Sequence, residues 1–395
     1  MKKNILIVTN KMVMGGVEKA LLGMINLIDS NNYNVTVFLL EEGGELRNNI
    51  PKWVNVKILP TINISIKDRI LLSIKEGDFI KGISILRYSI LTKLTKKSYK
   101  GAYYYNKIVN NVEEKYDLAI AYHTPLGFPV TYVIDNIKAK CKVAYIHGDM
   151  EQYRDRENFI DILKLYKKYY KKYDKIFCAC IDAKNKFLKC YPNLQDKIEI
   201  FKNILDINEI EQKSLQSNAF NKELNCINIV TVGRLSYEKG QNLIPNIIKI
   251  LLEDNINLKW YCIGDGPLRG KLENLINELD IKENFILLGT QNNPYPFIKN
   301  SDIYVQTSLF EGFCITLAEA KVLKKPIITT NFVGAKDQII NGKNGLIVEA
   351  KESEIYEAIY KLIMDKELRN KFEAELNMNT IDFTKEIYKL YELMQ

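Results

Sequence analysis

Histidine, paired cysteine and closely spaced aspartate are scarce in this chain, and this scarcity narrows its chemistry. The chain has two histidines, His123 and His147, and seven cysteines, none of them in a Cys-x-x-Cys pair. A structural zinc site is therefore not expected, and the odd cysteine count predicts reduced thiols in a cytosolic protein. No two aspartates are spaced as Asp-x-Asp. We therefore expect no metal site, no diphosphate held through a metal ion, and no cofactor.

Long hydrophobic runs are also missing. No apolar run approaches the ~20 residues that a bilayer-spanning helix needs. The opening residues, MKKNILIVTN, contain an apolar run of only four residues, which predicts a first β-strand rather than a signal peptide. The expected location is cytoplasmic.

A length of 395 residues with 47% hydrophobic residues suits two domains, each with its own core. Short apolar runs alternate with helical stretches, and the series restarts at residue 227, which predicts two Rossmann-like domains of the α/β class. Their parallel sheets are expected to face each other across a cleft, because ligands bind beyond the carboxyl ends of such strands. The expected boundaries are 1–205 for the first domain, 206–225 for a linker and 226–379 for the second domain, with a helix at about 380–395 packing back on the first.

The predicted strands of the first domain are 5–9, 35–39, 56–59, 118–121, 142–146 and 176–180, and those of the second are 227–232, 259–263, 285–288, 303–306, 327–329 and 346–348.

The most informative stretch is EGFCITLAE, residues 311–319. Glu311 lies in a glycine-containing loop after an apolar run, and Glu319 lies in the early turns of a helix that begins near Ile315. Unpaired N–H groups at that helix start would bind a diphosphate. Two carboxylates serve better as acceptors for hydroxyl groups, so the pattern predicts a sugar diphosphate. The alternative is that both glutamates are solvated charges favoured by the helix dipole.

Two further motifs follow predicted strands of the second domain. GRLSYEKG places Arg234 at a strand end and Lys239 near the next helix start. Two cations converging there would neutralise a diphosphate and stabilise its growing charge as a sugar leaves; the alternative is a pair of surface side chains at a turn. GDGPLR contains Gly264 and Gly266, which suit a ligand-lining loop or a tight turn alone.

The first domain carries weaker candidates at the ends of predicted strands. Gly15 and Gly16 would let a ligand approach the backbone, although they do not form G-x-G-x-x-G. His147 ends a strand facing the predicted cleft, which favours a site residue over a structural one. Asp149 better fits a helix cap, and His123 a structural role.

In this order, the motifs resemble those of retaining, family-4-type glycosyltransferases of the GT-B fold, the glycosyl transferases group 1. That family has an E-x7-E stretch, a G-R-x-x-x-x-K-G element and a G-x-G-P element, and the resemblance covers most of the chain. This chain departs from the pattern at Cys314, where glycine is usual, at Ala335 and Asp337, where glycine and glutamate are common, and at Ile204, which replaces a glycine.

The resemblance implies a role for each candidate. Glu311 and His147 would contact the donor sugar, Glu319 the ribose hydroxyls, and Arg234 and Lys239 the diphosphate. Residues with donor-binding roles would be Gly15, Gly16, Gly264, Gly266, Gly312, Phe313, Cys314, Ile315, Thr316, Leu317 and Glu319.

The implied activity is transfer of a hexose or N-acetylhexosamine, with retention of configuration and without metal. The donor would be a nucleotide diphosphate sugar, UDP-linked by preference, and the acceptor a surface polysaccharide such as capsule or lipopolysaccharide, or a lipid-linked oligosaccharide. No nucleophile–base–orienter triad is visible, so we expect front-face displacement in which the leaving phosphate accepts the acceptor's proton. The alternatives are a nucleotide-sugar epimerase, a glycan phosphorylase, or a non-catalytic basic protein that binds membranes or nucleic acid.

Positive charge gathers in two segments. Residues 61–101 hold nine Lys/Arg against three Asp/Glu, and 164–175 hold six lysines against one aspartate. Within the first, Phe79, Ile83, Leu86, Ile90 and Leu94 recur at steps of three and four, which predicts an amphipathic helix. The helix could lie on anionic lipid at the inner face of the cell membrane; we favour a helix packed on the core. Tyrosines interleave with lysines near 103–105 and 166–173, but no nucleic-acid module accompanies them, so nucleic acid is not an expected partner.

Overall fold

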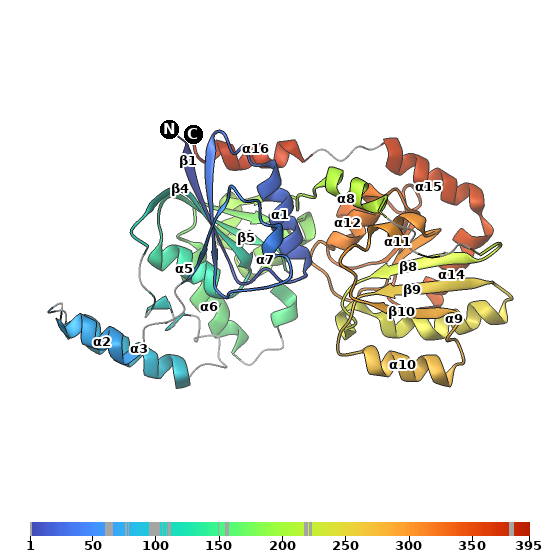
Figure 1. Ribbon diagram of the computed structural model, residues 1–395, viewed down its shortest axis with the longest axis horizontal. Helices are drawn as coiled ribbons and strands as arrows, with labels where there is room; N and C mark the ends of the chain where they lie inside the picture. The colour runs from blue at the N-terminus through green and yellow to red at the C-terminus, as the bar shows by residue number, and fades with distance from the viewer. Residues whose placement is uncertain are drawn as a thin grey trace. The chain divides into compact units, whose positions relative to one another are not determined.

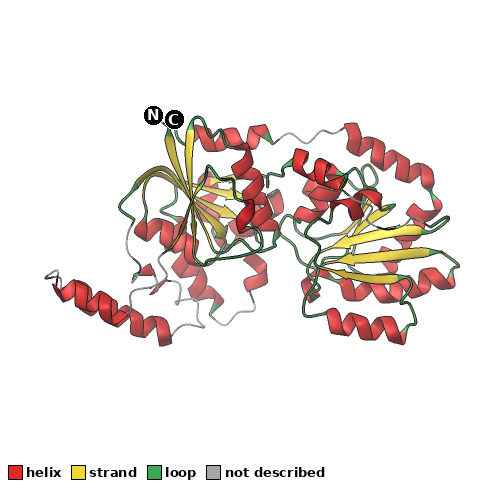
Figure 2. Ribbon diagram, viewed as in Figure 1, coloured by secondary structure: helices red, strands yellow, loops and turns green. Residues whose placement is uncertain are grey.

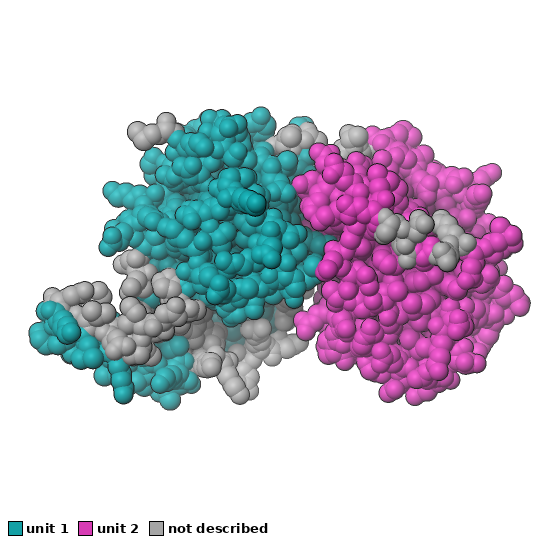
Figure 3. Space-filling model, viewed as in Figure 1, with its two compact units in different colours: residues 1–204, 383–395 teal, residues 205–382 magenta. Residues whose placement is uncertain are grey.

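The computed structural model describes residues 2–59, 66–75, 77, 79–94, 103–104, 106–107, 109, 112–148, 150–154, 158–216, 220, 223–378 and 383–395. The chain divides into two compact units, coloured separately in Figure 3. Unit 1 comprises residues 1–204 and 383–395, and unit 2 comprises residues 205–382. Both are built from parallel strands flanked by helices (Figure 2).

The described part of unit 1 contains a seven-stranded parallel sheet. Its order is β3 (Asn55–Ile58), β2 (Tyr33–Leu39), β1 (Lys3–Thr9), β4 (Lys115–Thr124), β5 (Lys138–Ile146), β6 (Lys175–Cys178) and β7 (Ile198–Ile200). The strands read as near-continuous apolar runs because a parallel sheet is covered on both faces; Ile5 to Val8 are fully buried. The strand order reverses between β1 and β4, so the chain segments after these two strands flank the natural ligand position of such a sheet.

The helices of unit 1, labelled in Figure 1, are α1 (Gly16–Leu27), α2 (Ile66–Lys75), α3 (Phe79–Leu94), α5 (Phe128–Asn136), α6 (Phe159–Tyr170), α7 (Ile181–Cys190) and α16 (Thr384–Glu392).

The C-terminal helix α16 packs on the sheet and helix that open the chain. It contacts α1, and the rings of Tyr391 and Tyr33 stack with centroids 4.4 Å apart. The Tyr391 hydroxyl accepts a hydrogen bond from the Asp29 amide at 3.0 Å, and Lys389 Nζ donates to the Ile200 carbonyl at 2.6 Å. The last residues of the chain are thereby part of unit 1.

In the lysine-rich segment 164–175, the tyrosine side chains are buried and the lysine side chains are exposed or half-buried. Tyr166, Tyr169, Tyr170 and Tyr173 are buried, and the Tyr173 hydroxyl donates to the Val130 carbonyl at 2.6 Å. The aromatic positions of this segment are therefore taken up by core packing and by hydrogen bonds to unit 1 itself.

Unit 2 contains a six-stranded parallel sheet within its described residues. Its order is β10 (Phe285–Gly289), β9 (Leu258–Ile263), β8 (Ile227–Val232), β11 (Ile303–Gln306), β12 (Ile327–Thr330) and β13 (Leu346–Val348). The reversal of strand order falls between β8 and β11, which pair through Ile303 and Ile229. This sheet has the same switch-point layout as the first.

The helices of unit 2 are α8 (Ile207–Ser214), α9 (Ile244–Glu253), α10 (Arg269–Glu278), α11 (Tyr295–Asn300), α12 (Ile315–Val322), α13 (Ala335–Gln338), α14 (Glu352–Met364) and α15 (Lys366–Met378).

Two groups of helices cover the sheet of unit 2. Helices α10 and α14 pack against α9 on one side, and α8, α11 and α12 contact one another on the other (Figure 1). Helix α9 is amphipathic: Ile244, Ile247, Ile248 and Leu251 are fully buried. These side chains join Trp260 of β9 in one hydrophobic core.

Two expectations differ from the structure. Residues 206–225, expected as a linker, begin with helix α8, whose N-cap Asp206 accepts from the Glu209 amide at 2.9 Å and whose Ile210 is buried. The local cap and the packing on α11 therefore outweigh the polar composition. Strand β7 was not anticipated, because its three residues, IEI, are too short to stand out as an apolar run.

Candidate active site

The sequence-predicted residues of unit 2 gather after β8 and β11, the two strands at which the sheet order reverses. Arg234 and Lys239 follow β8, and Glu311 follows β11. Backbone bonds tie the two loops together: the amides of Leu309 and Phe310 donate to the Glu238 carbonyl at 2.8 and 3.2 Å. The motifs that are 72 residues apart in sequence thus form one site, at the position where open α/β sheets bind ligands.

Lys239 and Glu311 form an ion pair at the centre of this site. The Lys239 ammonium donates a hydrogen bond to Oε1 of Glu311, and the two side chains are 22% and 12% exposed. Burial alone would lower the pKa of the Lys239 ammonium, but the charge of the Glu311 carboxylate and its hydrogen bond outweigh burial, and the pKa is raised above its ordinary value. Lys239 therefore stays protonated and carries a positive charge at this site. The Arg234 side chain, by contrast, is exposed.

A chain of buried hydrogen bonds leads from β11 to this ion pair. The Gln306 amide donates to Ser308 Oγ at 2.8 Å, and Ser308 Oγ donates to Glu311 Oε1 at 3.0 Å. Gln306 Oε1 accepts from the hydroxyls of Tyr304, at 2.7 Å, and Thr316, at 3.3 Å. Gln306 is fully buried. The orientation of the Glu311 carboxylate is therefore set by the strand behind it.

The glycines of GDGPLR permit two loops to lie in contact. A Cβ on Gly264, whose φ is +137°, would come within 2.1 Å of the Gly233 carbonyl oxygen, and one on Gly266 within 2.4 Å of that of Leu235. The loop after β9 thereby presses against the Arg234 segment after β8. This close approach explains the two glycines locally, and it places them beside the candidate phosphate site.

Cys314, the N-cap residue of helix α12, lies in the left-handed region with φ 62° and ψ 83°. Its thiol is buried and 3.4 Å from Thr316 Oγ1. Burial, and then the Glu311 carboxylate, raise the pKa of this thiol to about 12, so it remains protonated. Gln338 of α13 donates to the carbonyls of Phe313 and Cys314, the latter at 3.3 Å. The residues entering α12 are thus held from the side by α13.

Glu319 is placed differently from Glu311. Its carboxylate is 1% exposed, and Oε1 accepts a hydrogen bond from the Tyr295 hydroxyl at 3.0 Å. Tyr295 comes from α11, and burial, followed by the charge of Glu319, raises its pKa well above the ordinary value. The structure therefore separates Glu319 from the ion pair and gives it a tyrosine partner.

Gly15 and Gly16 lie at the start of α1, after β1 in unit 1. Gly15 is the N-cap and Gly16 the first residue of the helix, and a Cβ on Gly15 would meet Oε2 of Glu18 at 2.3 Å. Glu18 is 4% exposed, and burial raises the pKa of its carboxyl to about 7. The glycine therefore makes room for a buried acid at the helix start.

His147 follows β5 and is enclosed by two tyrosines of the same sheet. It is 6% exposed, and its ring centroid lies 3.9 Å from that of Tyr145 and 4.4 Å from that of Tyr122. The Tyr145 hydroxyl donates to Asn203 Oδ1 at 2.8 Å, which anchors this aromatic group. His123 ends β4, but its side chain and the whole of Asp149 lie outside the described residues.

Sequence reasoning missed the residues that support the predicted ones. Glu18 lies two residues after the glycine pair, so its position in the first turn of a helix was a readable signal. Gln306 and Ser308 are two residues apart at a strand end, which suggests polar side chains on one face but does not identify their target. Tyr295 and Gln338 act across helices, and nothing in the local pattern identifies them.

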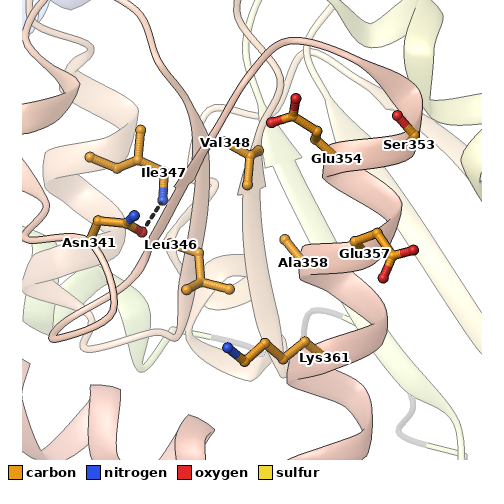
Figure 4. A pocket seen from close by; sticks show the side chains of 9 residues that line it. All are labelled: Asn341, Leu346, Ile347, Val348, Ser353, Glu354, Glu357, Ala358 and Lys361. Atoms are coloured by element: carbon orange, nitrogen blue, oxygen red, sulfur yellow. Dashed lines mark hydrogen bonds between the residues drawn. The ribbon is translucent and has the colours of Figure 1, made fainter.

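A separate pocket lies at the edge of unit 2, beside β13 and the start of α14 (Figure 4). It has a volume of about 450 Å³ and is lined among others by Asn341, Glu354 and Lys361; Asn341 Oδ1 accepts from the Ile347 amide at 2.9 Å. None of the sequence-predicted site residues lines it. In the described part of the chain, no three His, Cys, Asp or Glu residues are grouped to hold a metal ion.

Comparison with known proteins bears on the same region. The model of the family described as glycosyl transferases group 1 matches residues 211–376. An uncharacterised glycosyltransferase of Methanocaldococcus jannaschii is 31% identical over 249 residues, which are 60% of each protein. The chain spans about half of the length of the next two curated relatives. The UDP-Gal:alpha-D-GlcNAc-diphosphoundecaprenol alpha-1,3-galactosyltransferase of Escherichia coli is 24% identical and is covered over 94% of its length.

Among solved structures, Anabaena Alr3699/HepE in complex with UDP superposes with a TM-score of 0.70 at 15% identity, covering 99% of both chains. This likeness confirms the predicted fold, with two α/β units of parallel strands. Residues 211–376 are therefore similar to the glycosyl transferases group 1 family, and the chain has the GT-B fold.

Proposed function

We propose that this chain is a glycosyltransferase that takes a hexose or N-acetylhexosamine from a UDP-sugar. The acceptor is a growing surface polysaccharide or a lipid-linked oligosaccharide. Supporting the donor is the UDP named with the HepE structure. Supporting the acceptor is the lipid diphosphate named for the E. coli relative. The chain carries its candidate residues at the same kind of strand end in both sheets.

One observation carries this proposal: the Lys239–Glu311 ion pair at the switch point of unit 2, beside the N-terminus of α12. An ammonium and a carboxylate that form an ion pair suit a ligand in which a diphosphate is joined to a sugar, because each part of the ligand can bind one of the two groups. The diphosphate would form an ion pair with the Lys239 ammonium, and the sugar hydroxyls would donate hydrogen bonds to the Glu311 carboxylate.

The proposed mechanism follows from these positions. As the bond between the sugar and the β-phosphate breaks, negative charge grows on the leaving phosphate. Lys239, Arg234 and the amides at the start of α12 stabilise that charge, and Glu311 holds the sugar hydroxyls in a fixed orientation. The acceptor's hydroxyl oxygen bonds to the anomeric carbon on the face from which the phosphate leaves, and the leaving phosphate takes the hydroxyl proton, so configuration is retained. The proposal requires no metal.

The test is UDP release from UDP-sugars, with and without a lipid-linked acceptor and in the presence of EDTA. Arg234→Ala and Lys239→Ala are each expected to reduce turnover by ~10²-fold or more. Lys249→Ala, which removes an exposed lysine from α9, is the matched control and should retain turnover. Wild-type turnover in both site variants would remove the proposed phosphate clamp, and NMR of the product decides retention against inversion.

The same assay separates the other enzymes considered for this fold. Transfer requires an acceptor and releases UDP, epimerisation requires no acceptor, and phosphorolysis requires free phosphate. A thermal-shift panel of UDP-, GDP- and ADP-sugars tests the nucleotide. The absence of a shift with every nucleotide sugar would favour a non-catalytic protein instead.

A further inference from the structure

Helices α2 and α3 form a hairpin whose apolar face is exposed. Phe79, Ile83, Leu86, Ile90 and Leu94 of α3 are 62%, 68%, 48%, 50% and 77% exposed. They recur at steps of four, three, four and four, so they form one stripe along the helix. We expected this stripe to pack on the core, and the structure contradicts that expectation.

The opposite face of α3 is the one that packs. Gly82, Ile85 and Ser89 are buried. The Cα of Gly82 faces α2, where an added Cβ would lie 3.8 Å from the Ile70 carbonyl oxygen and from Ser73 Cβ. The two helices lie side by side (Figure 1), and the packed face of α3 includes the small residues Gly82 and Ser89, while the five residues of the stripe stay exposed. Leu71 and Ile74 of α2, 54% and 42% exposed, extend the apolar surface.

The described charged side chains around this stripe are all positive. Among the hairpin side chains that the structure describes, the charged ones are Lys67, Lys75, Arg87 and Lys93, and all four are exposed. An apolar stripe bordered by lysine and arginine is the surface that binds at the headgroup level of an anionic bilayer, because acyl chains accept the apolar residues and phosphates attract the cations. A second copy of the same hairpin would bring like charges together. In the described part of the chain, no helix is both long and apolar enough to cross a membrane.

We propose that the α2–α3 hairpin docks on the surface of a bilayer containing anionic lipid. Phe79, Ile83, Leu86, Ile90 and Leu94 insert at the headgroup boundary, and Arg87 and Lys93 lie among the lipid phosphates. The inference deepens the proposed function, because a lipid-linked acceptor is confined to such a surface. The docking inference rests on the exposed apolar stripe of the hairpin and does not depend on the candidate site in unit 2.

The test is flotation of the full chain with vesicles of phosphatidylcholine alone and of phosphatidylcholine mixed equally with phosphatidylglycerol. Binding is expected to the mixed vesicles and to weaken as salt is raised. Ile83→Glu/Ile90→Glu should reduce the bound-to-free ratio by roughly tenfold or more, because it places charge on the inserted face. Arg87→Gln/Lys93→Gln should reduce it by a similar factor on mixed vesicles only.

Matched controls come from unit 2. Met364→Glu/Met378→Glu alters two residues that are 63% and 73% exposed, and Lys249→Gln/Lys271→Gln removes two exposed lysines; both should bind vesicles like the wild type. Unchanged vesicle binding in Ile83→Glu/Ile90→Glu would overturn the proposal. A second result would also overturn it: the wild type forms a concentration-dependent dimer that does not bind vesicles, and Ile83→Glu/Ile90→Glu is monomeric. Each variant is tested for a thermal shift with UDP-sugar, so that loss of donor binding is distinguished from loss of docking.

Discussion

Lys239 donates a hydrogen bond to Oε1 of Glu311, and Ser308 donates to the same oxygen at 3.0 Å. One carboxylate oxygen therefore carries a cation on one side and a buried hydroxyl on the other. Without a donor the two charges neutralise each other, so the site can be held ready without an uncompensated buried charge. When the donor binds, we expect the Lys239–Glu311 ion pair to be replaced by contacts of each side chain with the donor.

The first prediction concerns the stability of the ion pair. Lys239→Met alone leaves the Glu311 carboxylate poorly solvated and should lower the free energy of unfolding of unit 2 by about 2 kcal/mol, a value reduced for the residual exposure of the pair. Lys239→Met/Glu311→Gln should recover most of that loss while remaining inactive. Urea unfolding followed through Trp260, which is fully buried in the core of unit 2, measures both effects.

The double variant is the informative control. If it is as unstable as the single variant, the two side chains do not compensate each other, and the ion pair has no role in holding the empty site.

The second prediction concerns Ser308. Ser308→Ala removes the hydroxyl that orients Glu311 and leaves the ion pair in place, so turnover should fall by about tenfold, the equivalent of one hydrogen bond to a charged group. The KM for the donor should change less than kcat, because an orienting contact matters most as the sugar leaves. Steady-state kinetics of UDP release separate the two constants.

Ser301→Ala is the matched control. Ser301 is also buried, and its hydroxyl donates to the Ile298 carbonyl at 2.7 Å, just before the same strand. An equal loss of kcat in both variants would mean that the effect comes from general damage to β11 and not from the orientation of Glu311.

Much of the fold could be predicted because buried parallel strands are recognisable in the sequence as apolar runs. Each of the twelve predicted strands overlaps an observed one, since a strand buried on both faces must be an apolar run. The α3 stripe shows where this reasoning fails. Its spacing identified the apolar face correctly, but spacing cannot say whether that face meets a core or stays exposed, because that depends on what else the chain places beside it.

The candidate site, like the fold, was only partly predictable from the sequence. The order of Lys239 and Glu311 after strand ends was sufficient to predict that they would meet, because strand order fixes where loops converge. The sequence could not show that Lys239 and Glu311 bond to each other, or that Glu319 is paired with Tyr295 of another helix. Such contacts depend on side-chain directions and helix packing, which a motif does not encode.

The third prediction concerns Cys314, which occupies a left-handed position with φ 62°. Cys314→Gly should leave the free energy of unfolding unchanged or raise it by about 1 kcal/mol, because relief of backbone strain offsets the loss of a small buried side chain. Cys314→Val should lower it by about 2 kcal/mol or more, because a β-branched residue is poorly tolerated at positive φ. Urea unfolding of unit 2 measures both.

Cys262→Val provides the comparison. Cys262 is 1% exposed and lies within β9, where extended backbone suits valine. If valine costs as much there as at position 314, the loss reflects side-chain volume and not the left-handed backbone at the start of α12.

The fourth prediction concerns the pH dependence of Glu18. Burial raises the pKa of its carboxyl to about 7 in the folded protein, above the ordinary value of 4.5. The folded state therefore binds more protons than the unfolded state between these values, and stability falls as pH rises through this window. Glu18→Gln, which stays neutral, should match the wild type near pH 5. It should exceed it near pH 8 by about 2–3 kcal/mol in the free energy of unfolding of unit 1.

Glu114→Gln tests whether the effect belongs to burial. The pKa of the exposed Glu114 carboxyl is lowered by hydrogen bonds from Lys57 and Tyr116, so its contribution has the opposite sign: it is present at neutral pH and is lost as the carboxyl is protonated in acid. Glu114→Gln should therefore gain no stability near pH 8. Parallel pH profiles for wild type and Glu18→Gln, measured by circular dichroism during urea unfolding, would mean that the carboxyl at the start of α1 is solvated in the folded protein. Gly15 would then be required for something other than making room for a buried acid.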